Sequence, residues 1–341
     1  MVTSAVNASL EAAWNDCLDA TSFATHYTAP EFFRESYFQG MEPFAVLATD
    51  GTTIAGVITG FVNGRDMVCG HAGSPRVCVR HGTDSDEVGR VLAAGLCSHV
   101  PPSVEFISVY TWNRMPGFET AAFRSRRFAA PLGTILLDLS QGTGRLFRQC
   151  SEAGRNKIRQ AIKAGVEVTE MNVAREFDEY YRLYQHWCEF NAAACQPYEI
   201  QRSVFESQGN RLILVARHYG RMIGVSTFRF RKPGLIESAA NVSRREDAEL
   251  CQNELLLWRG IEWSVQQKSF SHFSMTGAHF FLQKFGGELH ATYRYSLDRT
   301  FLRRRDTIAA LRSAAGHLYH RLPEPVKKTA RRLRQRRSEE D

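Results

Sequence analysis

Residues 251–288 read CQNELLLWRGIEWSVQQKSFSHFSMTGAHFFLQKFGGE, and this stretch decides the fold. Apolar side chains recur in it at helical spacing, at Leu255, Trp258, Ile261 and Val265. This spacing predicts a helix with one buried face. Asn253 precedes the apolar run and is predicted to be the N-cap, with Glu254 in the first turn. Because a helix start carries unpaired N–H groups and a partial positive charge, this end suits an anionic ligand.

The segment after this helix predicts a short strand over residues 270–276, which Gly277 ends. Helix, strand and glycine, followed by a Phe-Lys-x-x-Phe-Gly element, resemble the second half of FemAB-type acyltransferases, relatives of the GNAT acetyltransferases. Phe281, Phe285 and Gly286 match that last element here. Leu282 stands where the family has lysine.

Lys284 lies two residues beyond the missing lysine. In an extended segment, residues two apart point to the same face, so Lys284 is a candidate replacement. The substitution counts against a strict transfer-RNA-dependent enzyme of peptidoglycan bridges. It favours the broader acetyltransferase-like branch of the family.

A second distinctive stretch, residues 151–168, reads SEAGRNKIRQAIKAGVEV. Arg155, Arg159 and Lys163 repeat every four residues and form one basic edge of a predicted helix that Gly165 closes. Spacing alone is typical of a solvated face. The stretch also resembles the family's Arg-Asn-x-x-Arg-x-Ala-x-x-x-Gly-Val helix. This resemblance implies that Arg155, Asn156 and Arg159 bind an anionic part of the acceptor, because arginine offers a planar fork of donors.

The rest of the chain predicts a mixed α/β (α+β) fold. Strands at 44–49 and 54–62 form a hairpin across Asp50-Gly51, and 84–100 is a helix before a strand at 104–110. The order of hairpin, strand, helix and strand recurs from Arg211 to Thr276. The resemblance therefore implies two GNAT-like halves, each a mixed sheet flanked by helices, over residues 1–140 and 141–300. Residues 301–341 form a basic helical tail.

Composition separates this tail from the body. The chain of 341 residues has a net charge of +7, with 12 Lys/Arg against 5 Asp/Glu in residues 301–341. The eight cysteines form no Cys-x-x-Cys pair, so free thiols in a reducing compartment are expected, without a metal site. No apolar run is long enough to span a membrane and no signal pattern is present, so a cytoplasmic protein is expected. The tail suggests attraction to an anionic membrane surface, binding of RNA, or only a solvated terminus.

The resemblance implies acyl-CoA as co-substrate, held at the Asn253 helix start. Asn253 and Glu254 are the candidates on the helix for donor binding, and Arg244 and Arg245 are those in the loop before it. Candidate catalytic residues are Glu237, on the preceding strand, and two residues after the helix, His279 and Lys284. Candidates for acceptor binding are Tyr198 and Arg229, in addition to the residues named in the helix of 151–168.

The function expected from these residues is N-acyl transfer from acyl-CoA to an amine of a sugar, lipid-linked or peptide acceptor in envelope or surface-polysaccharide metabolism. One alternative is aminoacyl transfer from transfer RNA to a peptidoglycan precursor. An alternative of another class is a non-catalytic binding protein on the same fold, docked to membranes by its tail.

Overall fold

The computed structural model describes residues 2–3, 6–35, 40–129, 132–206 and 208–308. The chain divides into two compact units, Met1–Leu297 and Asp298–Asp341. Most of the basic tail predicted for 301–341 lies outside the described residues. Among the residues that are described, no helix has the length and apolar character needed to cross a lipid bilayer.

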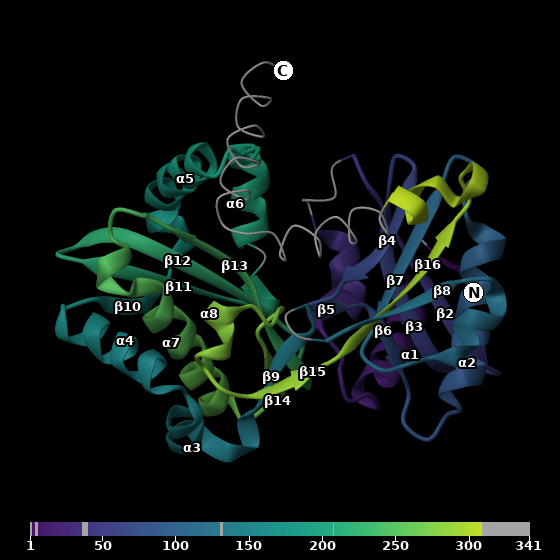
Figure 1. The fold of residues 1–341 in the computed structure, drawn as a ribbon, viewed down its shortest axis with the longest axis horizontal. Helices are drawn as coiled ribbons and strands as arrows, with labels where there is room; N and C mark the ends of the chain where they lie inside the picture. Colours follow the sequence, from purple (N-terminus) through teal and green to yellow (C-terminus); the bar gives the residue numbers. More distant parts are fainter. Residues whose placement is uncertain (1, 4–5, 36–39, 130–131, 207, 309–341) are drawn as a thin grey trace, which may run out of the picture. The chain divides into compact units, whose positions relative to one another are not determined.

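The first sheet is built around a hairpin of β2 and β3, with β4 and β7 as a parallel pair beside it (Figure 1). Its strands are β1 (Val2–Thr3), β2 (Glu42–Asp50), β3 (Thr53–Asn63), β4 (Asp66–His71), β5 (Ser74–Pro75), β6 (Val77–Val79), β7 (Phe106–Thr111), β8 (Arg124–Phe128) and β16 (Thr292–Asp298). Helices α1 (Ala8–Asp19) and α2 (Ser85–His99) pack on β2 and β3. Asn7 and Asp84 cap the two helices by accepting hydrogen bonds from backbone N–H groups.

The second sheet has the strand order β10-β11-β12-β13-β14-β9-β15. Its strands are β9 (Thr134–Asp138), β10 (Glu167–Glu170), β11 (Arg211–His218), β12 (Arg221–Phe230), β13 (Gly234–Ser243), β14 (Phe270–Ser274) and β15 (Glu288–His290). Strands β10 to β13 are antiparallel, and β13 pairs with β14 in parallel through the crossover helix α7 (Gln252–Gln267).

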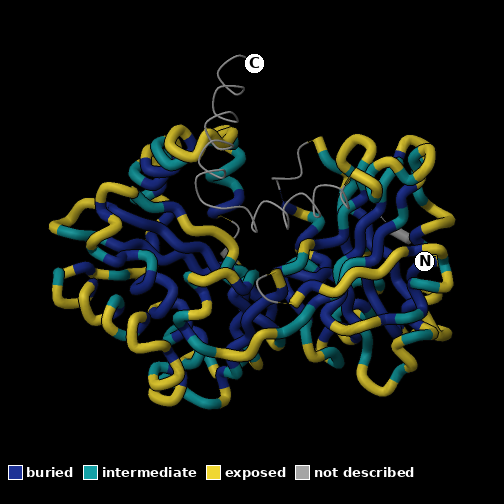
Figure 2. The backbone as a smooth tube through the Cα atoms, in the orientation of Figure 1, coloured by how far each residue is buried: buried dark blue, intermediate teal, exposed yellow. Residues whose placement is uncertain are grey.

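Helices cover both faces of the second sheet (Figure 1). One face packs on α3 (Gly142–Gln149), α4 (Glu152–Lys163), α7 and α8 (Phe280–Gln283). The other face packs on α5 (Val173–Phe190) and α6 (Tyr198–Glu206). Figure 2 shows the strands as the buried centre and the outer faces of the helices as the exposed layer.

Short 3-10 helices complete the described elements: η1 (His26–Thr28), η2 (Pro30–Arg34), η4 (Pro116–Ala121), η5 (Leu139–Gln141), η6 (Gln208–Asn210), η7 (Ala248–Leu250) and η8 (Phe301–Arg303).

The predicted order of hairpin, strand, helix and strand in each half and the mixed sheets are confirmed. The sheets do not follow the division at residue 140, because β9, which precedes it, lies in the second sheet and β16 lies in the first. Two local predictions are wrong. Helix α7 begins at Gln252 with Cys251 as N-cap in the left-handed region (φ 55°), so Asn253 is a first-turn residue. The segment before Lys284 is the short helix α8, not an extended chain, because residues 280–283 wind into one turn that packs Leu282 into the core.

Candidate active site

The two parallel strands of the second sheet separate at one end. Pairing of β13 with β14 ends at Glu237 opposite Ser274. From there β13 continues beside β12 alone, while Met275 N–H donates to the carbonyl of Ile135, in β9. In the part of the chain that the structure describes, no strand pairs with this edge of β13 beyond Glu237, and residues 239–241 are exposed. The Ser238 carbonyl accepts from the Thr276 hydroxyl at 2.7 Å, and beyond it the separation leaves backbone groups of β13 open to a ligand.

A cavity of about 380 Å³ occupies this separation. Its walls come from β12, β13, the first turns of α7, and the segment that follows β14. Its lining residues are Ser226, Ser238, Ala239, Ala240, Asn241, Asn253, Leu257, Met275, Thr276, His279, Phe281 and Leu282. Two of the sequence-predicted residues, Asn253 and His279, are therefore brought together here.

The start of α7 faces this cavity through Asn253. None of the described side chains caps the helix, so its first N–H groups keep their partial positive charge. The side-chain oxygens Oε1 of Gln252 and Oδ1 of Asn253 are shielded from water and have no hydrogen-bond partner among the described residues. The N–H groups of an uncapped helix start fit an anionic group of a ligand, whereas the two amide oxygens can only accept hydrogen bonds.

Glu237 lies at the point where the strands separate and is fully buried. The Ser74 hydroxyl, from the first half of the chain, donates to Glu237 Oε1 at 2.7 Å. Burial raises the pKa of Glu237 to about 7, although Ser74 and the charge of Arg76 act in the opposite direction. A hydrogen bond with Thr25, also from the first half of the chain, acts in the same direction as Ser74. A carboxyl with a pKa near neutrality is suited to accept and return a proton.

Positive charge surrounds Glu237. Arg229 sits opposite it on β12, and the Arg229 and Arg76 guanidinium groups lie 5.2 and 4.7 Å from the centre of the Tyr27 ring. Arg76 is 7% exposed, and its Nε and Nη1 have no hydrogen-bond partner among the described residues. Arg229 pairs with Glu35 Oε2 at 3.2 Å. Predicted residues Glu237 and Arg229 are thus neighbours in the structure.

Glu35 binds the two halves together from the first half of the chain. Its Oε1 accepts from Arg211 at 2.5 Å and contacts Nε2 of His26 at 2.5 Å. Burial opposes its ionisation, but the His26 hydrogen bond and the Arg229 and Arg211 charges outweigh burial and lower the pKa of Glu35. Burial lowers the pKa of His26 to about 4, so the imidazole is neutral near pH 7. The result is an ionised carboxylate held by two arginines.

Lys284 and Glu254 form a pair beside the cavity. Lys284 Nζ lies 3.4 Å from Glu254 Oε1, and 5.1 Å from the centre of the Phe281 ring, which lines the cavity. Lys284 therefore approaches the cavity from a helical turn. Glu254 is buried in the first turn of α7. His279 is exposed and stands at the cavity rim.

The helix predicted within residues 151–168 is α4, and its predicted acceptor-binding residues do not line the cavity. Arg155 Nη1 donates to the carbonyls of Arg148, at 3.1 Å, and Cys150, at the end of α3. Arg159 stacks 5.5 Å from the Phe147 ring, and Asn156 is exposed. These contacts fasten α4 to α3.

The remaining candidates lie elsewhere. Tyr198, on α6, donates from its hydroxyl to Asp178 Oδ1 at 2.5 Å and packs on aromatic rings of α5. Arg244 contacts Glu246 at 3.5 Å, and exposed Arg245 stacks 5.0 Å from the Phe190 ring. The Arg244 carbonyl accepts a hydrogen bond from the Gln252 side chain, so this loop is fixed to the start of α7.

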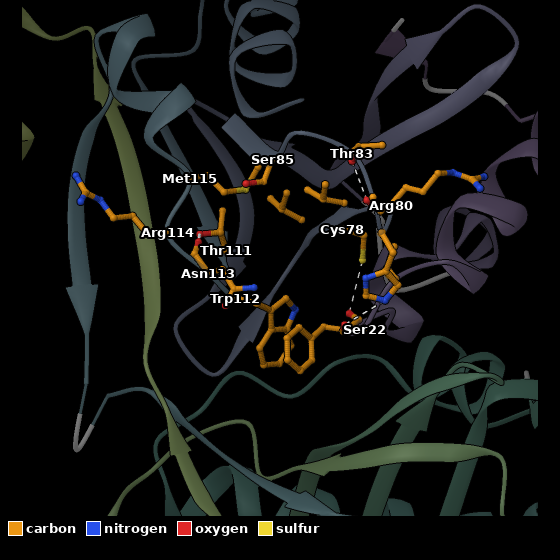
Figure 3. Close-up of a pocket in the computed structure, with 16 residues that line it drawn as sticks. Ser22, Cys78, Arg80, Thr83, Ser85, Thr111, Trp112, Asn113, Arg114 and Met115 are labelled. Carbon is orange, nitrogen blue, oxygen red and sulfur yellow. Dashed lines mark hydrogen bonds between the residues drawn. The ribbon is translucent and has the colours of Figure 1, made fainter. Parts of the chain in front are cut away.

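The first half repeats the parallel pair, because β4 and β7 separate beyond Cys69 and Val109. Its own chain fills that gap: Arg76 N–H donates to the Tyr110 carbonyl, and the Arg76 carbonyl accepts from Thr59 N–H. A cavity of about 240 Å³ remains near the start of α2. Figure 3 shows Arg80 and Arg114 pointing away from each other at its two sides, and Arg80 pairs with Asp16 while Arg114 pairs with Glu119. The second half therefore holds the better ligand site.

Sequence reasoning did not include Ser74 and Arg76 among the candidates. Gly73 explains how they reach Glu237: a Cβ atom on it would lie 1.7 Å from the Thr276 carbonyl oxygen, so only glycine lets this loop touch the end of β14. The sequence signal was Gly73 itself, but nothing local to it indicates a contact with residues 200 positions away.

Comparison with solved structures identifies the fold. FemX superposes with a TM-score of 0.64 over 87% of this chain and 97% of its own, at 8% identity. The C-terminal domain of a putative lysylphosphatidylglycerol synthetase from Agrobacterium fabrum gives 0.56, over 89% and 95%, at 12% identity. A tandem GNAT protein from the clavulanic acid biosynthesis pathway gives 0.53, over 85% and 95%, also at 12%. No family model and no curated protein matches the sequence. The predicted tandem GNAT-like, FemAB-type fold is confirmed.

Proposed function

We propose that this chain is an acyltransferase that moves an acyl group from acyl-CoA to an amine. The observation that carries the proposal is the open edge of β13. It lies beside the uncapped start of α7 and begins at a buried carboxyl whose pKa is about 7. A thioester-bearing chain laid along the edge gains backbone hydrogen bonds, and its phosphates reach the α7 N–H groups.

In the proposed reaction Glu237 takes the proton from the attacking ammonium group, which turns it into a nucleophilic amine. The amine nitrogen then forms a bond to the acyl carbonyl carbon, the carbon–sulfur bond breaks, and the thiol leaves with a proton. Donors at the edge of β13 stabilise the developing oxyanion. His279 at the rim and Lys284 beside Phe281 act on the leaving group or the oxyanion, and Arg76 and Arg229 bind an anionic part of the acceptor.

Arg244 and Arg245 remain proposed ligands for the donor's phosphates, since their loop is joined to the start of α7. The acceptor amine belongs in this proposal to a sugar, a lipid-linked molecule or a peptide of the cell envelope. Two of the similar structures carry the names FemX and lysylphosphatidylglycerol synthetase, which supports that direction.

A second candidate is aminoacyl transfer from transfer RNA, favoured by Lys284, whose ammonium group approaches the Phe281 ring although position 282 is leucine. A non-catalytic protein docked to anionic membranes by residues 301–341 is the candidate of another class. Salt-sensitive binding to anionic vesicles without binding of any donor would favour it.

Thermal unfolding with acetyl-CoA, longer acyl-CoAs and free coenzyme A tests the donor. A ligand that binds only the folded state stabilises it by RT ln(1 + [L]/Kd), about 2.7 kcal/mol at a hundredfold excess over Kd. Asn253→Asp places a negative charge at the start of α7 and should weaken binding. Asn63→Asp makes the same change at the exposed last residue of β3 and should leave binding unchanged. No stabilisation by any thioester would reject acyl-CoA as the donor.

The base is tested separately. Glu237→Gln should retain donor binding and lose transfer to an amine acceptor, because the amide cannot accept the proton. Transfer at the wild-type rate in this variant would remove Glu237 from the mechanism.

A further inference from the structure

A second cavity, of about 590 Å³, lies where β9, β14 and β15 meet, and Phe23 from the first half closes one side. None of its lining residues, among those the structure describes, lines the proposed donor cavity. The proposed acyl transfer uses none of its side chains. Its polar walls are Asp138, Gln141, Gln149, His272, Glu288 and His290.

A hydrogen-bonded chain fixes one wall. Gln149 Nε2 donates to Gln141 Oε1 at 2.7 Å, and Gln141 Nε2 donates to Asp138 Oδ2 at 3.3 Å. Hydrogen bonds from Ser140 lower the pKa of Asp138, so its carboxylate is ionised near pH 7. Each carboxylate oxygen has two acceptor sites, and Oδ2 uses one of them within this chain. The wall thus presents a fixed negative acceptor to the cavity.

Two imidazoles also line the cavity. His272 stands opposite Asp138 in the β14–β9 register, so the two side chains share a face. Burial lowers the pKa of His272, and its Nδ1 is shielded without a partner among the described residues. His290 Nε2 lies 2.8 Å from the Trp112 carbonyl, which can only accept, so Nε2 carries the proton. The other ring nitrogen, Nδ1, accepts a hydrogen bond whenever it carries no proton.

An aromatic group forms the opposite wall. Phe23 stacks on Trp112 with ring centres 4.9 Å apart and lies 5.3 Å from the His290 ring. Trp112 is buried, and its Nε1 donor has no partner among the described residues. The cavity thus combines an apolar ring face with several hydrogen-bonding groups, as small-molecule sites do.

Charge decides the class of ligand. Asp138 and Glu288 line the cavity, and its described lining includes no lysine or arginine. An anion would stand against two carboxylates with no counter-charge, which is unfavourable. In the described residues no set of three or more His, Cys, Asp or Glu side chains is arranged to hold a metal ion. We infer that this cavity binds a polyhydroxylated amine such as an amino sugar, with its hydroxyl and ammonium donors on the polar wall and its ring on Phe23.

Binding of glucosamine is measured without any acyl donor. The result therefore tests this inference independently of the proposed acyl transfer. Histidine imidazole signals are followed by NMR during titration with glucosamine, glucose and glucose 6-phosphate. Variants at His272, His290 and His279 assign the signals. Glucosamine should shift the His272 and His290 signals and leave that of His279 in place, and it should bind more tightly than glucose 6-phosphate.

Two variants sharpen the result. Asp138→Asn should weaken glucosamine binding by about tenfold or more, as expected for loss of a charged hydrogen bond. Glu288→Lys changes an exposed residue, so folding should be retained while the preference moves toward glucose 6-phosphate. Glu167→Gln, which removes an exposed carboxylate on β10, is the neutral control. Unmoved His272 and His290 signals, or tighter binding of glucose 6-phosphate by the wild type, would overturn the inference.

Discussion

Glu237→Gln should change how the free energy of unfolding depends on pH. The carboxyl is fully buried, and burial raises its pKa to about 7 from an ordinary value near 4.5. Between these two pH values the folded chain holds a proton that the unfolded chain has released. Stability from this group is therefore complete below about pH 4.5 and is lost as the pH rises through 7. Glutamine stays neutral, so the variant lacks this loss.

The size of this change in stability follows from the difference between the folded and unfolded pKa values of Glu237. At 1.36 kcal/mol for each pKa unit, the interval from 4.5 to about 7 corresponds to roughly 3 kcal/mol. Solvent does not screen this carboxyl, because its side chain is fully buried. The Ser74 hydroxyl can donate equally to the amide oxygen of glutamine, so the variant keeps the hydrogen bond at Oε1.

Urea unfolding of wild type and variant near pH 5 and pH 8 measures the effect. Wild type should lose about 2.5 kcal/mol more than Glu237→Gln between these pH values, because only the wild type ionises at this site and part of the change lies below pH 5. Glu167→Gln removes an exposed carboxylate on β10 and should behave as wild type. Parallel pH dependence of wild type and Glu237→Gln would refute the assignment of a proton to Glu237.

Three further variants test the packing. Gly73→Ala places a Cβ 1.7 Å from the Thr276 carbonyl oxygen and should lower the free energy of unfolding by about 3 kcal/mol. Glu35→Gln leaves buried arginines without their carboxylate and should lower it by about 3 kcal/mol, as for other broken buried pairs. Gly260→Ala sets a Cβ 2.4 Å from the Phe228 ring and should lower it by about 1 kcal/mol. Urea midpoints measure all three, and an unchanged midpoint would show that the contact relaxes freely.

The periodicity of apolar residues was sufficient to predict helices and hairpins whose structure depends on nearby residues alone. The apolar face of α7 is buried as predicted, from Leu255 to Ile261. Helix α4 and its closing glycine follow the predicted limits, with Gly165 at φ 79°. Hairpins at Asp50-Gly51 and Tyr219-Gly220 were also predictable, because such turns need a residue with positive φ.

Residues that act across the chain were not predictable in this way. Ser74 and Glu237 are 163 positions apart, and their hydrogen bond depends on how the two halves pack. The backbone contacts of Arg155 were not predictable either, because spacing along a helix does not show which carbonyl groups a long side chain reaches. Asn253 was mistaken for a cap because Cys251 adopts a left-handed conformation that its residue type does not indicate.

The two halves share one plan, yet among the residues that the structure describes only the second keeps an open edge between its parallel strands. In the first half, residues 74–79 turn back into the gap, and Arg76 joins β3 to β7 through its backbone. The same short segment directs Ser74 to Glu237 and the Arg76 side chain to Tyr27. The segment that fills the gap between β4 and β7 thus supplies the groups that bury and surround Glu237 at the gap between β13 and β14. This dependence gives a physical reason for the two halves to form one compact unit, since neither alone would hold Glu237 with a pKa near 7.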